Sequence, residues 1–182
     1  MENRKIRVGI THGDINGVGY EVILKTFSDP TMLELCTPVV YGSPKVAAYH
    51  RKAMEIQTSF SIVNSAEEVQ DGRVNVVNCI EEELKVELTK PTPEAGKTAL
   101  AALERALADY REGLFDVLVT APINKHTIQS DVFHFPGHTE YIEERVGEGQ
   151  KALMILLKGD FRVALVTGHV PVRDLSLIHI SE

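Results

Sequence analysis

The stretch TPEAGKTALAALERALADYREG, residues 92–113, decides the fold class of this chain. Thr92 is a residue type that caps helix N-termini, and Pro93 suits the first helical position. Gly113 is typical of the position just after a helix. The stretch therefore predicts one long helix, and a phosphate-binding loop ending at Glu94–Thr98 is excluded because Pro91 stands where its first glycine is required. The predicted buried face comprises Ala95, Ala99, Ala102, Leu103, Ala106 and Tyr110.

Short apolar runs lie on both sides of the long helix. Several are apolar at consecutive positions, as expected for strands that are covered on both faces. We predict strands at Ile6–Ile10, Val39–Tyr41, Phe60–Val63, Val74–Val77, Val117–Thr120, Ala152–Leu157 and Val163–Thr167. We predict further helices at Val18–Phe27, Pro44–Met54 and Tyr141–Val146. This alternation of strands and helices predicts an α/β fold with a largely parallel sheet.

Composition bounds the class of protein. The 182 residues are enough for one ordinary domain or slightly more, and 43% hydrophobic with 25% charged residues is a globular composition. The net charge of -7 argues against nucleic acid as a partner. Cys36 and Cys79 lie far apart without a paired motif, which favours small apolar fillers in a reducing compartment. The chain has no signal-peptide core and no apolar run near the ~18 residues that span a bilayer, so we expect a cytoplasmic protein without a membrane partner.

Polar segments stand where ligands bind in open α/β sheets, beyond the carboxyl ends of the strands. They are THGDINGVG (residues 11–19), TAPINK (120–125), PGHTEY (136–141) and TGHVPVRD (167–174). In the first, Gly13, Gly17 and Gly19 permit two interpretations. Their backbone N–H groups could approach an anion, or the glycines could form only a tight turn into a helix. Their spacing matches no dinucleotide or phosphate-loop motif.

His138 and Thr139 lie at a predicted helix start, after Pro136 and Gly137. Unpaired N–H groups of a first helical turn, an imidazole and a hydroxyl could together hold a carboxylate or hydroxyl group of a substrate. The alternative is that Thr139 caps the helix and His138 belongs to the loop.

His169 follows the last predicted strand. Neutral imidazole is a common ligand of divalent metals, but one histidine is not a site, and a loop histidine is the alternative. The remaining histidines have no special sequence context and are expected at the surface or as satisfied core residues. They are His12, His50, His126, His134 and His179.

The four polar segments, occurring together and in this order, resemble the PdxA family of 4-hydroxythreonine-4-phosphate dehydrogenases. The similarity rests on GDINGVGYE (residues 13–21), TAPINK, FPGHTE (135–140) and TGHVPVRD. It implies the two-domain α/β fold of isocitrate and isopropylmalate dehydrogenases, in a homodimer with active sites at the subunit interface. It also implies His138 and Thr139 as substrate-binding residues and His169 as a metal ligand. The implied cofactors are NAD or NADP and a divalent metal (Zn, Mg or Co), and the implied substrate is a small phosphorylated hydroxy-amino acid.

The chain departs from the family pattern at both ends. Ile15 and Tyr20 stand where the family usually has prolines. The resemblance covers roughly residues 5–175. We expect residues 1–175 to be an N-terminal portion of such a dehydrogenase and residues 176–182 to be a non-native tail. We therefore expect the chain alone to be inactive. Two alternatives stay open, namely a D-threonate or D-erythronate 4-phosphate dehydrogenase, because the residues that read the amino group are not all present, and a non-catalytic binding module.

Overall fold

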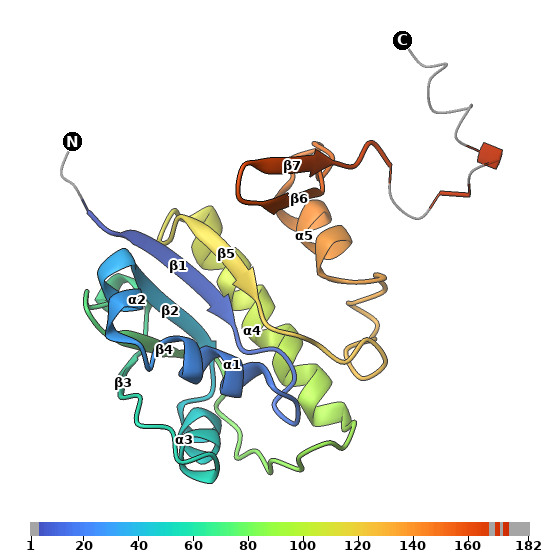
Figure 1. Cartoon of the computed structure of the whole chain (residues 1–182). Helices are drawn as coiled ribbons and strands as arrows, with labels where there is room; N and C mark the ends of the chain where they lie inside the picture. Colours follow the sequence, from blue (N-terminus) through green and yellow to red (C-terminus); the bar gives the residue numbers. More distant parts are fainter. Residues whose placement is uncertain (1–3, 168–169, 172, 175–182) are drawn as a thin grey trace.

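A computed structural model describes residues 4–167, 170–171 and 173–174 (Figure 1). Five strands form one sheet in the order β3-β4-β2-β1-β5, and every neighbouring pair is parallel. The predicted α/β fold with a parallel sheet is therefore confirmed. The strands are β1 (Ile6–Thr11), β2 (Cys36–Gly42), β3 (Phe60–Val63), β4 (Val74–Asn78) and β5 (Val117–Thr120).

Helices cover both faces of the sheet (Figure 1). One face is covered by the long helix α4, which packs against β1, β2 and β5. On the other face α1 packs against α3, and α3 in turn contacts β4. Successive residues of β2 point to opposite faces, so Val40 joins the cluster under α1 and α3 while Val39 and Tyr41 join the cluster under α4. The helices are α1 (Gly19–Thr26), α2 (Pro30–Leu35), α3 (Pro44–Ala53), α4 (Pro93–Arg111) and α5 (His138–Val146), and a short 3₁₀ turn lies at Ala66–Glu68.

The ends of α4 follow the sequence prediction closely. The Thr92 side chain accepts a hydrogen bond from the backbone N–H of Ala95, and Gly113 adopts a φ of 72° just beyond the helix. Five of the six predicted face residues are buried, whereas Tyr110 is 40% exposed. The short helix α2 was missed by the sequence analysis, although Asp29 caps its first turn at Thr31 N and Pro30 opens it.

The last two strands differ from the prediction. β6 (Ile155–Lys158) and β7 (Phe161–Ala164) form a separate antiparallel hairpin, and all eight of its residues are exposed. The expectation of a buried strand at Val163–Thr167 is wrong in both its bounds and its burial. Only Gly159 and Asp160 separate the two strands. A link that short can join only antiparallel neighbours, because a parallel pair needs a long crossover.

Two further expectations concern the cysteines and membrane-spanning segments. Cys36 and Cys79 are both free, as predicted. In the described part of the chain, every helix is too short or too polar to cross a membrane.

Candidate functional site

The order of the strands singles out one place on the sheet edge. From β1 the chain proceeds to β2 on one side, whereas α4 later brings β5 to the other side of β1. Ligands of open α/β sheets bind at such a reversal, outside the carboxyl ends of the two strands. Here that place is lined by residues 12–19 after β1, called the glycine loop below, and by residues 121–125 after β5.

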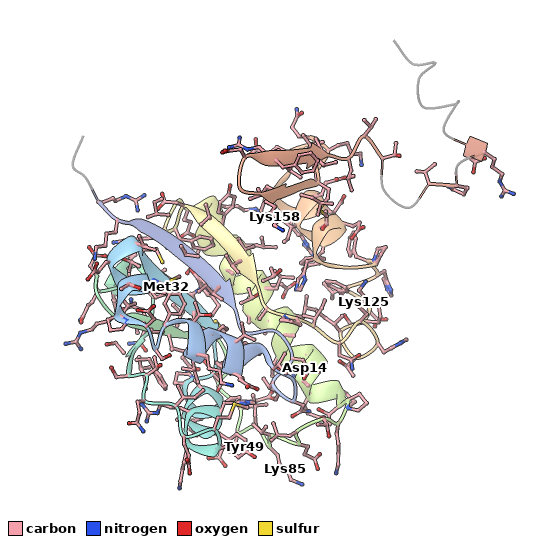
Figure 2. The ribbon with its side chains drawn as sticks, viewed as in Figure 1. Asp14, Met32, Tyr49, Lys85, Lys125 and Lys158 are labelled. Carbon is pink, nitrogen blue, oxygen red and sulfur yellow. The ribbon has the colours of Figure 1, made fainter. Side chains whose placement is uncertain are left out.

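The glycine loop and residues 121–125 are in direct contact. The backbone N–H of Asp14 donates to the carbonyl oxygen of Pro122 at 2.9 Å, and that of Ala121 donates to Thr11 at 3.1 Å. Figure 2 labels Asp14 and Lys125 in these two segments. Two of the four polar segments are thus brought together as the sequence predicted.

The glycines of the loop serve close packing rather than an open anion cradle. Gly13 has a φ of 72°, and a Cβ atom on it would overlap the carbonyl oxygen of Pro122. A Cβ atom on Gly19 would overlap the carbonyl oxygen of His12. Since these neighbours are carbonyl oxygens, they would repel an anion. Of the two interpretations, the structure supports the tight turn at these two positions.

Asn16 connects the glycine loop to the start of α4, a role that the sequence analysis missed. Its side chain is buried, donates to Lys90 O at 2.9 Å and to Thr92 Oγ1 at 3.1 Å, and accepts from Glu87 N at 2.8 Å. Its backbone carbonyl also accepts from Thr89 N at 2.9 Å. All these partners lie more than seventy positions away, so no local pattern announces them.

His138 and Thr139 open helix α5. The N-cap position is occupied by Gly137, and Thr139 lies inside the first turn. The alternative in which Thr139 caps the helix is therefore wrong. Thr139 is exposed and His138 is half-buried. Burial and the nearby Lys125 ammonium both lower the pKa of His138, which keeps the imidazole neutral at pH 7. A neutral ring can either accept or donate a hydrogen bond.

Lys125, the last residue of TAPINK, is a functional candidate that was not predicted from the sequence. Its side chain is exposed, and no ion pair to it is formed within the described ranges. The first turn of α5 offers unpaired N–H groups beside the neutral His138. Together these groups suit a small anion or a hydroxyl group.

His169, the predicted metal ligand, lies outside the described residues. The strand expected to deliver it ends at Ala164 and is exposed. Within the described ranges, no three or more His, Cys, Asp or Glu side chains gather as a metal site would require.

His12 and His50 have a specific environment that their sequence context did not reveal. Both are fully buried, and both rings stack on Tyr20, at centroid distances of 5.3 Å and 5.5 Å. Burial lowers the pKa of His12 to about 4. Ile15 and Tyr20, the two departures from the family pattern, are themselves core residues of this cluster.

Comparison with known proteins gives one family. The family model described as "Pyridoxal phosphate biosynthetic protein PdxA" matches residues 34–179. A 4-hydroxythreonine-4-phosphate dehydrogenase of Bacteroides thetaiotaomicron is 73% identical over 97% of this chain and 48% of its own length. A protein of Oceanobacillus iheyensis named "Putative D-threonate 4-phosphate dehydrogenase" is 30% identical over 92% of this chain and 51% of its own length. The chain thus spans about half the length of the curated relatives it matches.

A solved structure of a 4-hydroxythreonine-4-phosphate dehydrogenase from Burkholderia phymatum has the same fold. It superposes with a TM-score of 0.81 at 27% identity, over 94% of this chain and 52% of that chain. The two-domain organisation implied by the resemblance concerns the whole length of such proteins, of which this chain spans about half.

Proposed function

Because this chain belongs to the PdxA family, we propose that residues 1–175 are the N-terminal portion of a 4-hydroxythreonine-4-phosphate dehydrogenase. The observation that carries the proposal is the 73% identity to the Bacteroides thetaiotaomicron enzyme across nearly the whole chain. The proposed reaction oxidises the secondary alcohol of 4-phosphohydroxy-L-threonine with NAD or NADP. The product, 2-amino-3-oxo-4-phosphohydroxybutanoate, then loses carbon dioxide and leaves 3-amino-2-oxopropyl phosphate. The remaining parts of the proposal are a homodimer in the cytoplasm and residues 176–182 as a non-native tail.

The proposed role of this chain is to bind and orient the substrate. His138 and Thr139 present a neutral imidazole and a hydroxyl at the start of α5, where backbone N–H groups are unpaired. Lys125 adds a positive charge beside them against the chain's net charge of -7. A substrate held by these groups would have its anionic part near α5 and its alcohol near the crevice between β1 and β5.

His169 is proposed as one ligand of a divalent metal (Zn, Mg or Co), which would polarise the substrate alcohol when bound. The described residues supply no metal site of their own, and Gly13 and Gly19 supply no open cradle for a nucleotide phosphate. We therefore assign no step of the reaction to groups in this part of the chain beyond substrate binding.

The main alternative substrate is a phosphorylated sugar acid. A D-threonate or D-erythronate 4-phosphate has the same phosphate and alcohol but lacks the amino group. The lower identity of 30% to the Oceanobacillus iheyensis relative makes this alternative the weaker one. A non-catalytic binding module is the alternative from a different class.

The test is to recover the complete gene and to assay reduction of NAD and NADP with both substrate classes. We expect turnover of 4-phosphohydroxy-L-threonine by the complete protein. We expect none from residues 1–182 alone, since correct placement of the reactants is worth roughly 7–11 kcal/mol of barrier. Faster turnover of D-threonate 4-phosphate would favour the alternative substrate. A complete gene that ends at Glu182 would favour the binding module, and NADH production by residues 1–182 would disprove the assignment as a partial enzyme.

Single variants of the complete protein test the residues. His138→Ala and Thr139→Ala should weaken turnover while the metal content is unchanged. His169→Ala should lower metal content and kcat together. His134→Ala, at an exposed histidine outside the candidate site, is the control and should change neither quantity. Loss of metal in His138→Ala with an intact KM would show that the roles are reversed.

A further inference from the structure

His50 makes a directed hydrogen bond from helix α3 to the glycine loop. Its Nε2 atom lies 2.8 Å from the carbonyl oxygen of Ile15, in the middle of the loop. A carbonyl oxygen can only accept, so Nε2 must carry the proton. The other ring nitrogen, Nδ1, is buried and has no hydrogen-bond partner within the described ranges. The one hydrogen bond of the buried His50 ring, within the described ranges, is therefore the bond to the loop backbone.

The orientation of the His50 ring is held by two aromatic neighbours. Tyr20 stacks on it at 5.5 Å, and Tyr49 meets it edge-on at 5.6 Å. Tyr20 is in turn fixed to the start of α3, since its hydroxyl donates to Ser43 O at 3.1 Å and accepts from Ser43 N at 2.8 Å. A ring held in this way can place its N–H on Ile15 within a narrow range of directions.

The bond from His50 comes from α3, whereas the hydrogen bonds of the neighbouring loop residues Asp14 and Asn16 go to other segments. Asp14 N binds Pro122 beyond β5, and Asn16 binds the segment before α4. Ile15 lies between these two residues and is fully buried. The backbone of the loop is thus held at three consecutive residues by three different parts of the fold.

We propose that His50 is a positioning residue, which fixes the glycine loop and so holds Asp14 at the crevice between β1 and β5. One carboxylate oxygen of Asp14 already accepts from Asn16 N at 2.8 Å, which shapes the turn inside the loop. The consequence for a substrate rests on the proposed function. The effect on the loop itself does not, and it can be measured on this chain without any activity.

The test is amide hydrogen exchange on residues 1–182, with two replacements of His50. His50→Leu removes the donor at similar volume, whereas His50→Gln keeps an N–H that can reach the position of Nε2. We expect His50→Leu to speed exchange at the amides of Asp14, Gly17 and Thr89 by about 10- to 100-fold, because a buried carbonyl loses its partner. We expect His50→Gln to restore most of the protection. Amides of β4 should change much less in both variants.

Tyr20→Phe is the matched control. It removes two buried hydrogen bonds to Ser43 but leaves the stacked ring and the bond to Ile15. It should lower the melting temperature but speed exchange in the loop much less than His50→Leu, because the hydrogen bond from His50 to Ile15 is kept. Unselective exchange over the whole chain in His50→Leu, or failure of His50→Gln to restore protection, would overturn the proposal.

A measurement on the unmodified chain covers the case in which His50→Leu does not fold. Nuclear magnetic resonance of the imidazole nitrogens should show the Nε2–H form of His50, with a ring proton that exchanges slowly. An Nδ1–H form, or a ring proton that exchanges as fast as that of the exposed His134, would overturn the proposal. None of these readouts depends on dehydrogenase activity, so failure here and failure of the proposed function are distinguishable.

Discussion

Strand β2 and the hairpin β6–β7 both contain consecutive apolar residues, yet their environments are opposite. Val39, Val40 and Tyr41 are consecutive apolar residues with at most 1% of their surface exposed. Leu156 and Leu157 are also consecutive, yet 58% and 71% of their surfaces are exposed. The difference lies in the neighbours, because β2 has a strand on each side and helices over both faces. An apolar run therefore predicts a strand, whereas its burial depends on segments elsewhere in the chain.

The largest expected effect compares a buried with an exposed leucine. Leu103 on α4 is 1% exposed, whereas Leu157 in the hairpin is 71% exposed. We expect Leu103→Ala to lower the free energy of unfolding by about 2–5 kcal/mol through lost burial and a residual cavity. We expect Leu157→Ala to change it by less than about 0.5 kcal/mol. Urea denaturation of both variants checks this contrast, which fails if the two losses are similar.

A pH dependence of similar size is expected from His12 in the sheet region. Its folded-state pKa is lowered from the usual 6.5 to about 4, because the ring is buried. The folded state thus binds fewer protons than the unfolded state. The contribution of His12 to the free energy of unfolding is therefore fully present above pH 6.5 and is lost as the pH falls toward 4. The loss amounts to about 3 kcal/mol.

Urea denaturation at pH 7 and pH 4.5 measures this loss, and His12→Gln is the control. Glutamine keeps a donor for Thr98 O, which His12 Nε2 contacts at 3.3 Å, but it does not titrate. Carboxylates with lowered pKa values, such as Asp116, also make the protein less stable as the pH falls. They do so equally in the variant and in the unmodified chain. An equal pH dependence in the variant and the unmodified chain would show that His12 does not contribute.

Most of the fold could be predicted because it follows from local patterns. The ends of α4 agree with the prediction within two residues, since Thr92, Pro93 and Gly113 act within one helical turn. The five sheet strands also lie where apolar runs predicted them. The hairpin was misjudged because burial depends on contacts between distant segments.

The candidate site was predictable only where a sequence motif marks it. PGHTEY located the start of α5, and TAPINK located the segment after β5. Asn16 and His50 were missed because each acts on a backbone atom distant in sequence, at Lys90 and Ile15 respectively. Such contacts are determined by the packed fold, and neither residue type by itself indicates them.

A smaller effect compares two ion pairs. Asp109 is 4% exposed and accepts from Tyr41 Oη and from Arg105 Nε, both at 2.9 Å. Removing its carboxylate leaves the Tyr41 hydroxyl buried without a partner, so Asp109→Ala should cost about 1–3 kcal/mol. Lys151, paired with Glu143 near the hairpin, is fully exposed, so Lys151→Ala should have no measurable effect. Thermal melting of both variants checks this prediction. Equal shifts in melting temperature for Asp109→Ala and Lys151→Ala would contradict it.

The smallest effect on folding, but a clear one on association, is expected from the hairpin itself. Residues paired across it share a face, so Leu156, Val163 and Phe161 lie on one face while Ile155 and Leu157 lie on the other. Apart from Lys158 on the first face and Arg162 on the second, both faces are apolar and exposed, which favours association of residues 1–182 in solution. Replacing Leu156 and Phe161 together by Thr keeps strand propensity and removes much of one face. We expect less concentration-dependent association in analytical ultracentrifugation and less than about 0.5 kcal/mol change in the free energy of unfolding.

Val22→Thr, at an exposed apolar residue of α1, is the matched control and should leave association unchanged. Unchanged association in the double variant would show that another surface joins the molecules, whereas a loss of stability like that of Leu103→Ala would show that the hairpin is packed in solution.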